Sequence, residues 1–141
     1  MSRVYWDTMV FIYWLENHPS YATRVEQIFQ AMVTRGDRLY ASTLSIGEAL
    51  ARPLKQQQFQ LVAQIEQVFD SGLIEVLPFD RKAAGRFAKL RATTNASPAD
   101  AIHLACAGAA GVDLFLTHDK SLHKLQVDGI QFIVGLDVNV F

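Results

Sequence analysis

Four acidic side chains stand where an apolar run of the sequence gives way to a helical pattern. Asp7 and Asp119 follow runs that predict short strands, Glu48 lies in a helix after another such run, and Asp100 begins an alanine-rich helix. The carboxyl ends of parallel strands share one edge of an open sheet, so we expect these acids to converge there. Crowded carboxylates repel one another unless a cation joins them. Oxygen-only ligands favour a hard divalent ion, which predicts a Mg²⁺ or Mn²⁺ site.

Each of these acids also has a purely structural interpretation. Asp7 and Asp119 can be helix N-caps, whereas Ser45-x-x-Glu48 and Ser97-x-x-Asp100 fit the capping box. In that motif a hydroxyl and an acid three residues later satisfy free backbone N–H groups. Any one of the four, taken alone, reads first as a cap. Their recurrence at four strand-to-helix transitions favours the metal site.

The elements that position these acids alternate along the chain. Apolar runs predict strands at residues 3–6, 39–41, 73–77, 114–116 and 131–134. Helical spacing predicts helices at residues 20–35, 56–69, 81–91 and 98–110, a short one at 10–15, one that carries Glu48 and ends near Pro53, and one from Asp119 through Leu125. Phe59 is expected on the inward face of its helix. The alternation argues for an α/β fold, a three-layer sandwich with a mostly parallel central sheet.

Length and composition limit the class of protein further. A chain of 141 residues, half of them hydrophobic, fits one globular domain and excludes disorder. The net charge of −1 gives no general attraction to nucleic acid, so such binding requires a local basic patch. The sequence contains neither a signal-peptide pattern nor an apolar run of membrane-spanning length. We therefore expect a cytoplasmic protein without a membrane partner.

The histidines and the single cysteine do not suggest a second kind of chemistry. None of them has the context of a zinc ligand or a catalytic triad. Cys106, inside the alanine-rich helix, is interpreted as a small buried hydrophobe. His103 lies one turn after Asp100 and is expected to be a packed, hydrogen-bonded core histidine, with contact to substrate or an ordered water as the alternative. His118 is expected to be the more exposed of the two, and we assign it no role.

One predicted helix is strongly basic and is expected beside the acidic crevice. Its candidate RNA-binding residues are Arg81, Lys82, Arg86 and Lys89. A solvated helix face explains the same pattern equally well.

Four motifs follow one another along the chain: Asp7-Thr8 after the first strand, Ser45-x-x-Glu48, Pro98-Ala99-Asp100-Ala101-Ile102-His103-Leu104-Ala105 and Leu116-Thr117-His118-Asp119. In this order they resemble the motifs of the PIN-domain nucleases, and among them most of all the VapC-type toxins of toxin–antitoxin pairs. The resemblance covers essentially the whole chain. It therefore implies a single PIN-like nuclease domain over residues 1–141.

The resemblance further implies a Mg²⁺- or Mn²⁺-dependent endoribonuclease that is the toxin of a type II toxin–antitoxin system. On that basis the catalytic and metal-binding residues are Asp7, Glu48, Asp100 and Asp119, supported by Thr117 and Ser45. It also implies an RNA substrate, a homodimer and a cognate antitoxin that blocks the site. The apolar stretch Val138–Phe141 is a candidate part of the dimer surface. We expect the antitoxin to place an Arg or Lys among the acids, because an organic cation can take the place of the metal.

The chain departs from many members of this family at Met9, where they carry Asn. A thioether cannot form the hydrogen bonds of an amide, which leaves the orientation of Asp7 open. Three alternative functions are a PIN-like domain in RNA processing, a catalytically silent binding module and a phosphatase with an aspartate nucleophile. The phosphatase would use Asp7 as its nucleophile and needs a second acid two residues later, but that position is occupied by Met9.

Overall fold

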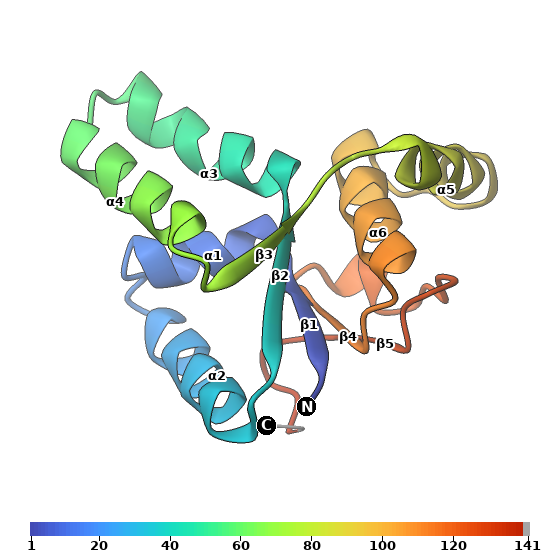
Figure 1. The fold of residues 1–141 in the computed structure, drawn as a ribbon, viewed down its shortest axis with the longest axis horizontal. Helices are drawn as coiled ribbons and strands as arrows, with labels where there is room; N and C mark the ends of the chain where they lie inside the picture. The colour runs from blue at the N-terminus through green and yellow to red at the C-terminus, as the bar shows by residue number, and fades with distance from the viewer. Residues whose placement is uncertain (140–141) are drawn as a thin grey trace.

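A computed structural model describes residues 1–139, and Figure 1 traces the arrangement of their helices and strands. The strands within these residues are β1 (Arg3–Trp6), β2 (Arg38–Ser42), β3 (Ile74–Leu77), β4 (Leu114–Leu116) and β5 (Phe132–Val134). The helices are α1 (Thr8–Leu15), α2 (Ala22–Arg35), α3 (Thr43–Lys55), α4 (Phe59–Asp70), α5 (Arg81–Thr93) and α6 (Pro98–Ala110), with the short 3-10 helix η1 (Lys120–Leu122).

The strands form one sheet in the order β3-β2-β1-β4-β5. Every neighbouring pair is parallel, so the described sheet is parallel throughout rather than mostly parallel. The first strand lies at its centre, where Tyr5 pairs with Tyr40 on one side and with Phe115 on the other. All carboxyl ends therefore meet at one edge of the sheet, and loops from the central strands open there.

Helices cover both faces of the sheet, which confirms the predicted three-layer sandwich. Side chains of β1 alternate between the faces. Val4 and Trp6 pack in the core shared with α1 to α4, whereas Tyr5 packs in the core shared with α5 and α6. Figure 1 shows these two groups of helices on opposite sides of the strands. Both cores are apolar, so the sheet is buried on its two faces, as parallel sheets require.

Local chemistry explains where several helices begin and end. Gly36 and Gly111 end α2 and α6 with φ angles of +74° and +72°, a left-handed conformation that glycine adopts without steric cost. Ser97 is the N-cap of α6 and Pro98 its first residue, as predicted. Asp80 caps α5 by accepting a hydrogen bond from the backbone N–H of Ala83 at 3.0 Å.

The structure moves one predicted helix end. The third helix does not stop at Pro53 but runs through it to Lys55. A proline this close to the helix end removes one backbone donor, and the turn beyond it still closes through the bond from Gln56 N–H to the Arg52 carbonyl. The difference lengthens α3 at the end remote from Glu48.

Three expectations about the helices after Pro53 and after Asp119 are wrong. The next helix begins at Phe59 rather than at residue 56. Gln57 adopts a left-handed φ of +58°, and a right-handed helix cannot continue through such a residue. Phe59 is the first residue of that helix and is 64% exposed, so it does not face inward. After Asp119 the chain forms only the 3-10 turn η1, which ends at Leu122 rather than continuing to Leu125.

Among residues 1–139 no helix combines the length and the apolar character needed to cross a membrane. Of the apolar stretch Val138–Phe141, the last two residues lie outside the described residues.

Candidate functional site

A cleft of about 620 Å³ opens at the carboxyl edge of the central strands, and all four predicted acids line it. Asp7 directly follows β1, and Asp119 follows the adjacent strand β4. Glu48 reaches the same cleft from α3 and Asp100 from the first turn of α6. The structure thus brings together residues that are up to 112 positions apart in the sequence (119 − 7).

Asp7 is held by hydrogen bonds to both of its carboxylate oxygens. The backbone N–H of Thr8 donates to Oδ1 at 2.8 Å, and the buried Thr117 hydroxyl donates to Oδ2 at 2.8 Å. The Thr117 oxygen in turn accepts from the backbone N–H of Asp119 at 3.0 Å. Met9 lines the cleft and is 45% exposed. Asp7 is therefore oriented without an amide at position 9, and Thr117 links two of the acids.

Glu48 is bound through one oxygen to two donors on other elements. Its Oε1 lies 2.6 Å from the Thr8 hydroxyl and 2.6 Å from Nε2 of His103. The pKa of Glu48 lies below its ordinary value, because the bond from His103 and then that from Thr8 favour the charged form over the opposing effect of burial.

The capping-box interpretation of Ser45 and Glu48 is wrong. Ser45 is itself the third residue of α3, and its Oγ accepts from the backbone N–H of Ser42 at 3.1 Å. Glu48 lies beyond this first turn and caps nothing. Ser45 fixes the start of the helix that carries Glu48, and within residues 1–139 no hydrogen bond joins it to one of the four acids.

The negative charges of other acids in the cleft act on Asp100. Its backbone N–H donates to Ser97 Oγ at 3.2 Å, so the N-cap of α6 is formed by the serine. The pKa of the Asp100 carboxyl is raised by burial and further by the negative charges of Asp7 and Asp119. The mutual repulsion expected from the sequence is thus present in the cleft.

Asp119 keeps the role of a cap. Its Oδ1 accepts from the backbone N–H of Ser121 at 3.0 Å and from the Ser121 hydroxyl at 2.6 Å. This explains the start of η1, and it leaves Asp119 at the exposed rim of the cleft. Capping and cleft lining therefore coexist in one residue.

The donor set of the cleft fits a hard divalent cation in its chemistry, because it consists of carboxylates that repel one another. As the side chains stand, no group of three or more His, Cys, Asp and Glu within residues 1–139 is arranged to hold an ion. One oxygen of Glu48 faces His103 and one of Asp119 faces Ser121. The carboxylates that would hold such a cation are those of Asp7, Glu48, Asp100 and Asp119.

The structure settles the surroundings of the histidines and the cysteine. His103 is 1% exposed and hydrogen-bonded, as predicted, but the sequence did not indicate its contact with Glu48. His118 is half-buried, hence the more exposed of the two, and its Nδ1 lies 2.9 Å from the Tyr13 hydroxyl. Cys106 is buried, and burial raises the pKa of its thiol to about 11.

Two further residues touch the acids or their partners without a clear signal in the sequence. Thr8 binds Glu48, and Tyr5 binds the His103 ring at 2.6 Å. The signals for them were indirect: Thr8 is adjacent to Asp7, and His103 lies one helical turn from Asp100. Nothing in the spacing of Tyr5 indicated its partner.

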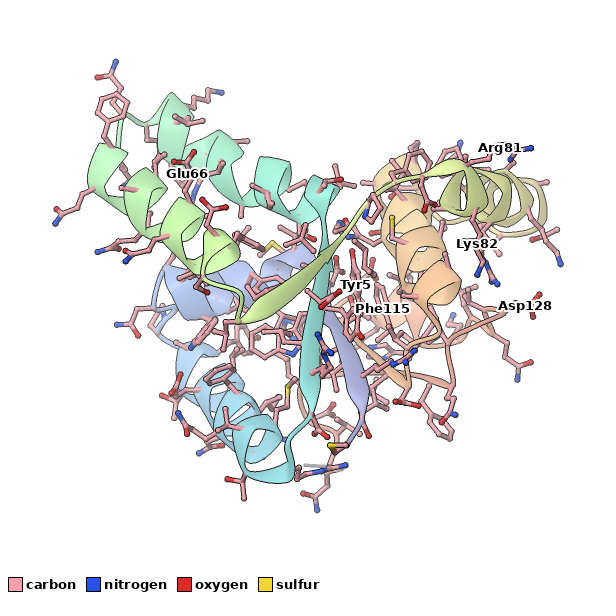
Figure 2. All side chains as sticks on the ribbon, viewed as in Figure 1. Tyr5, Glu66, Arg81, Lys82, Phe115 and Asp128 are labelled. Atoms are coloured by element: carbon pink, nitrogen blue, oxygen red, sulfur yellow. The ribbon has the colours of Figure 1, made fainter. Side chains whose placement is uncertain are left out.

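The basic residues of α5 do not lie beside the acidic cleft, contrary to expectation. Lys82, Arg86 and Lys89 line a separate pocket of about 590 Å³. Lys82 donates to the Ala109 carbonyl and Arg86 to the Asp128 carbonyl. Ala109 is about 13 Å from Asp100 along the axis of α6, at 1.5 Å per residue. In Figure 2 the labelled side chains of Lys82 and Asp128 lie beyond α6, on the side away from the strands. Three of the four basic residues thus share one pocket, and none of the four lines the cleft that holds the acids.

Solved structures that resemble this fold come from toxin–antitoxin systems. VapBC2 from Rickettsia felis, bound to a DNA fragment from its promoter, superposes with a TM-score of 0.75 at 14% identity over 94% of this chain and 98% of that chain. A toxin–antitoxin complex from Klebsiella pneumoniae gives 0.71 at 16% identity over 90% and 94%. The sarcin-ricin loop cleaving toxin VapC20 from Mycobacterium tuberculosis gives 0.71 at 11% identity over 87% and 96%.

Comparison at the level of sequence families agrees with the fold. No curated protein matches the chain. The family model of the PIN domain matches residues 4–127, which include every acid of the cleft. The protein belongs to the PIN-domain family.

Proposed function

We propose that this protein is a Mg²⁺- or Mn²⁺-dependent endoribonuclease and the toxin of a type II toxin–antitoxin system. The observation that carries the proposal is the gathering of Asp7, Glu48, Asp100 and Asp119 in one cleft, where burial and then the charges of Asp7 and Asp119 raise the pKa of Asp100. Crowded carboxylates are stable together when a divalent cation neutralises them.

The cleft residues divide the work of such a reaction. When bound, the metal supplies the positive charge that activates a water and stabilises the phosphate in the transition state. Asp7 contributes a carboxylate that is oriented at both oxygens by Thr8 and Thr117. Glu48 contributes a second carboxylate that stays ionised, because hydrogen bonds lower its pKa. A reaction of this kind needs no nucleophilic side chain.

The proposed partners follow from the relatives in fold. The similar structures include VapBC complexes, and one relative is described as cleaving the sarcin-ricin loop. We infer that this chain likewise cleaves RNA in the cytoplasm, forms a homodimer and is inhibited by a cognate antitoxin. An Arg or Lys of the antitoxin placed among the acids would satisfy them as a metal does. The neighbouring gene is then expected to encode a small protein with a basic C-terminal segment.

One experiment separates this function from its alternatives. The purified protein is incubated with Mn²⁺ and a mixed RNA pool, and in parallel with para-nitrophenyl phosphate. RNA fragments without release of nitrophenol support the nuclease. Nitrophenol release supports the phosphatase, and RNA binding without Mn²⁺ affinity supports the silent module. Growth arrest on expression in a bacterial host, relieved by the neighbouring gene, distinguishes a toxin from an RNA-processing domain.

The basic residues of α5 are expected to bind RNA at a distance from the cleft. Replacing Arg81, Lys82, Arg86 and Lys89 by Gln should weaken RNA binding, because it removes positive charges that contact phosphates. Each lost contact should also reduce the magnitude of the slope of log K against log salt, by about 0.7 for single strands. The binding constant for RNA is measured by fluorescence anisotropy at several salt concentrations between about 50 and 200 mM.

The matched control removes a cation elsewhere. Arg38 pairs with Glu75 at the amino end of β2, on the edge of the sheet opposite the cleft. Arg38→Gln should leave the salt slope unchanged. If the slope is unchanged in the quadruple variant as well, the basic residues of α5 do not contact RNA and form only a solvated helix face.

A further inference from the structure

A chain of hydrogen bonds runs from the core of the sheet to Glu48. The Tyr5 hydroxyl lies 2.6 Å from Nδ1 of His103, and Nε2 of the same ring lies 2.6 Å from Glu48 Oε1. The Thr8 hydroxyl lies 2.6 Å from that Glu48 oxygen and 3.1 Å from His103 Nε2. The participants come from β1, α1, α3 and α6, so the network ties four elements to one carboxylate.

The donors in this chain have one consistent direction. The Tyr5 hydroxyl carries one hydrogen and lies within hydrogen-bond distance of Nδ1 of His103. With that proton donated to Nδ1, a neutral His103 ring carries its own hydrogen on Nε2 and donates it to Glu48. With a donor at Nδ1 and a carboxylate at Nε2, the ring hydrogen belongs on the nitrogen that faces Glu48.

Packing holds His103 in place. Its ring meets the Tyr5 ring edge-on, with the centroids 5.8 Å apart and the planes at 68°. Tyr5 in turn stacks on Phe115 of the neighbouring strand at 5.0 Å with an interplanar angle of 8°, and both lie side by side in Figure 2. Neither Tyr5 nor Phe115 is exposed at all. The donor that faces Glu48 is thus packed against fully buried side chains of two adjacent strands, β1 and β4.

Glu48 itself needs such an anchor. Its side chain is 34% exposed and is long enough to adopt several rotamers. Both donors bind Oε1, and within the described residues no hydrogen bond reaches Oε2. Fixing Oε1 from the core side leaves Oε2 as the oxygen available to the cleft.

We propose that His103, supported by Tyr5, is a positioning residue that orients Glu48 so that one carboxylate oxygen is presented to the divalent ion. The proposal rests on the proposed metal-dependent function of the cleft. Groups that hydrogen-bond to metal ligands commonly change metal affinity or activity by about 10- to 100-fold when they are removed. His103 fits this description, because it hydrogen-bonds to Glu48 and is not itself one of the four acids that would hold the ion.

The test measures Mn²⁺ binding by electron paramagnetic resonance, with no RNA present. His103→Leu should weaken Mn²⁺ affinity by about 10- to 100-fold. His103→Gln retains an N–H donor near the position of Nε2 and should recover most of the affinity. Tyr5→Phe keeps the ring on Phe115 but removes the bond to Nδ1, so it should weaken binding less than His103→Leu does. Cleavage rates should fall in the same order.

Controls make each outcome decisive. Tyr40→Phe removes a hydroxyl from a neighbouring strand in the same core and should leave Mn²⁺ affinity unchanged. If His103→Leu does not fold, as judged by circular dichroism, Tyr5→Phe decides the question, because His103→Gln is expected to stay near the wild type. Wild-type affinity in a folded His103→Leu or, where that variant does not fold, in Tyr5→Phe would overturn the positioning role while leaving the metal-dependent nuclease intact. A wild-type protein that binds no Mn²⁺ would overturn both proposals.

Discussion

Removing divalent cations with EDTA is expected to abolish RNA cleavage, and added Mg²⁺ or Mn²⁺ to restore it. The acids of the cleft cannot activate water or neutralise a phosphate alone, and a metal supplies several kcal/mol of transition-state stabilisation. Since each 1.36 kcal/mol corresponds to tenfold in rate, the loss should be on the order of 10³-fold. Cleavage is measured on radiolabelled single-stranded and hairpin-loop RNA. These substrates expose bases and phosphates that a duplex holds away from a small site.

The control for this prediction is the same RNA incubated with Mn²⁺ and without protein. Cleavage by the protein that persists in excess EDTA, at the rate measured with metal, would exclude the proposed mechanism. Restoration by Mn²⁺ but not by Mg²⁺ would retain it and would show which ion the carboxylates prefer.

Asp100→Asn is expected to be inactive and yet no less stable than the wild type. The folded-state pKa of Asp100 lies above its ordinary value, so its ionised form destabilises the fold at neutral pH, and that penalty disappears as the pH falls below the unfolded value. An amide of the same size removes the charge, while Ser97 remains the N-cap. We expect a loss of activity of at least about 10²-fold, a little under 3 kcal/mol of transition-state stabilisation. Cleavage and urea unfolding at neutral pH in EDTA are the measurements.

A true capping residue provides the matched control. Asp80 caps α5 and lines no part of the acidic cleft. Asp80→Ala should lose about 0.5–2 kcal/mol of stability and keep its activity. An Asp100→Asn variant that behaves like Asp80→Ala, destabilised but active, would return Asp100 to the role of a helix cap.

Much of the fold was predictable because it depends on local patterns. The apolar run before Asp7 and the one before Asp119 predicted β1 and β4, and these strands are neighbours in the sheet. Parallel strands place their following residues at the same edge, so adjacency of the two acids follows from topology alone. Ser97 and Pro98 likewise predicted the start of α6 from capping chemistry.

The parts that sequence analysis missed depend on contacts between distant elements. Tyr5, Glu48 and His103 join through a hydrogen-bonded chain across β1, α3 and α6, and no local pattern encodes such a chain. The basic face of α5 was recognisable, but its position relative to the cleft depends on how α5 packs on α6. Pro53 predicted a helix end from backbone chemistry that the last turn of α3 accommodates.

Thermal unfolding of the wild type and Asp100→Asn, each in EDTA and in Mg²⁺, tests most directly whether the four acids form one metal site. A ligand that binds only the folded state stabilises it by RT ln(1 + [L]/Kd), about 2.7 kcal/mol at 100 times Kd. We predict that Mg²⁺ raises the wild-type Tm by several degrees and raises that of Asp100→Asn by less, while in EDTA the variant melts no lower than the wild type. A wild-type Tm that does not respond to Mg²⁺, together with a variant that melts lower in EDTA, would contradict the account.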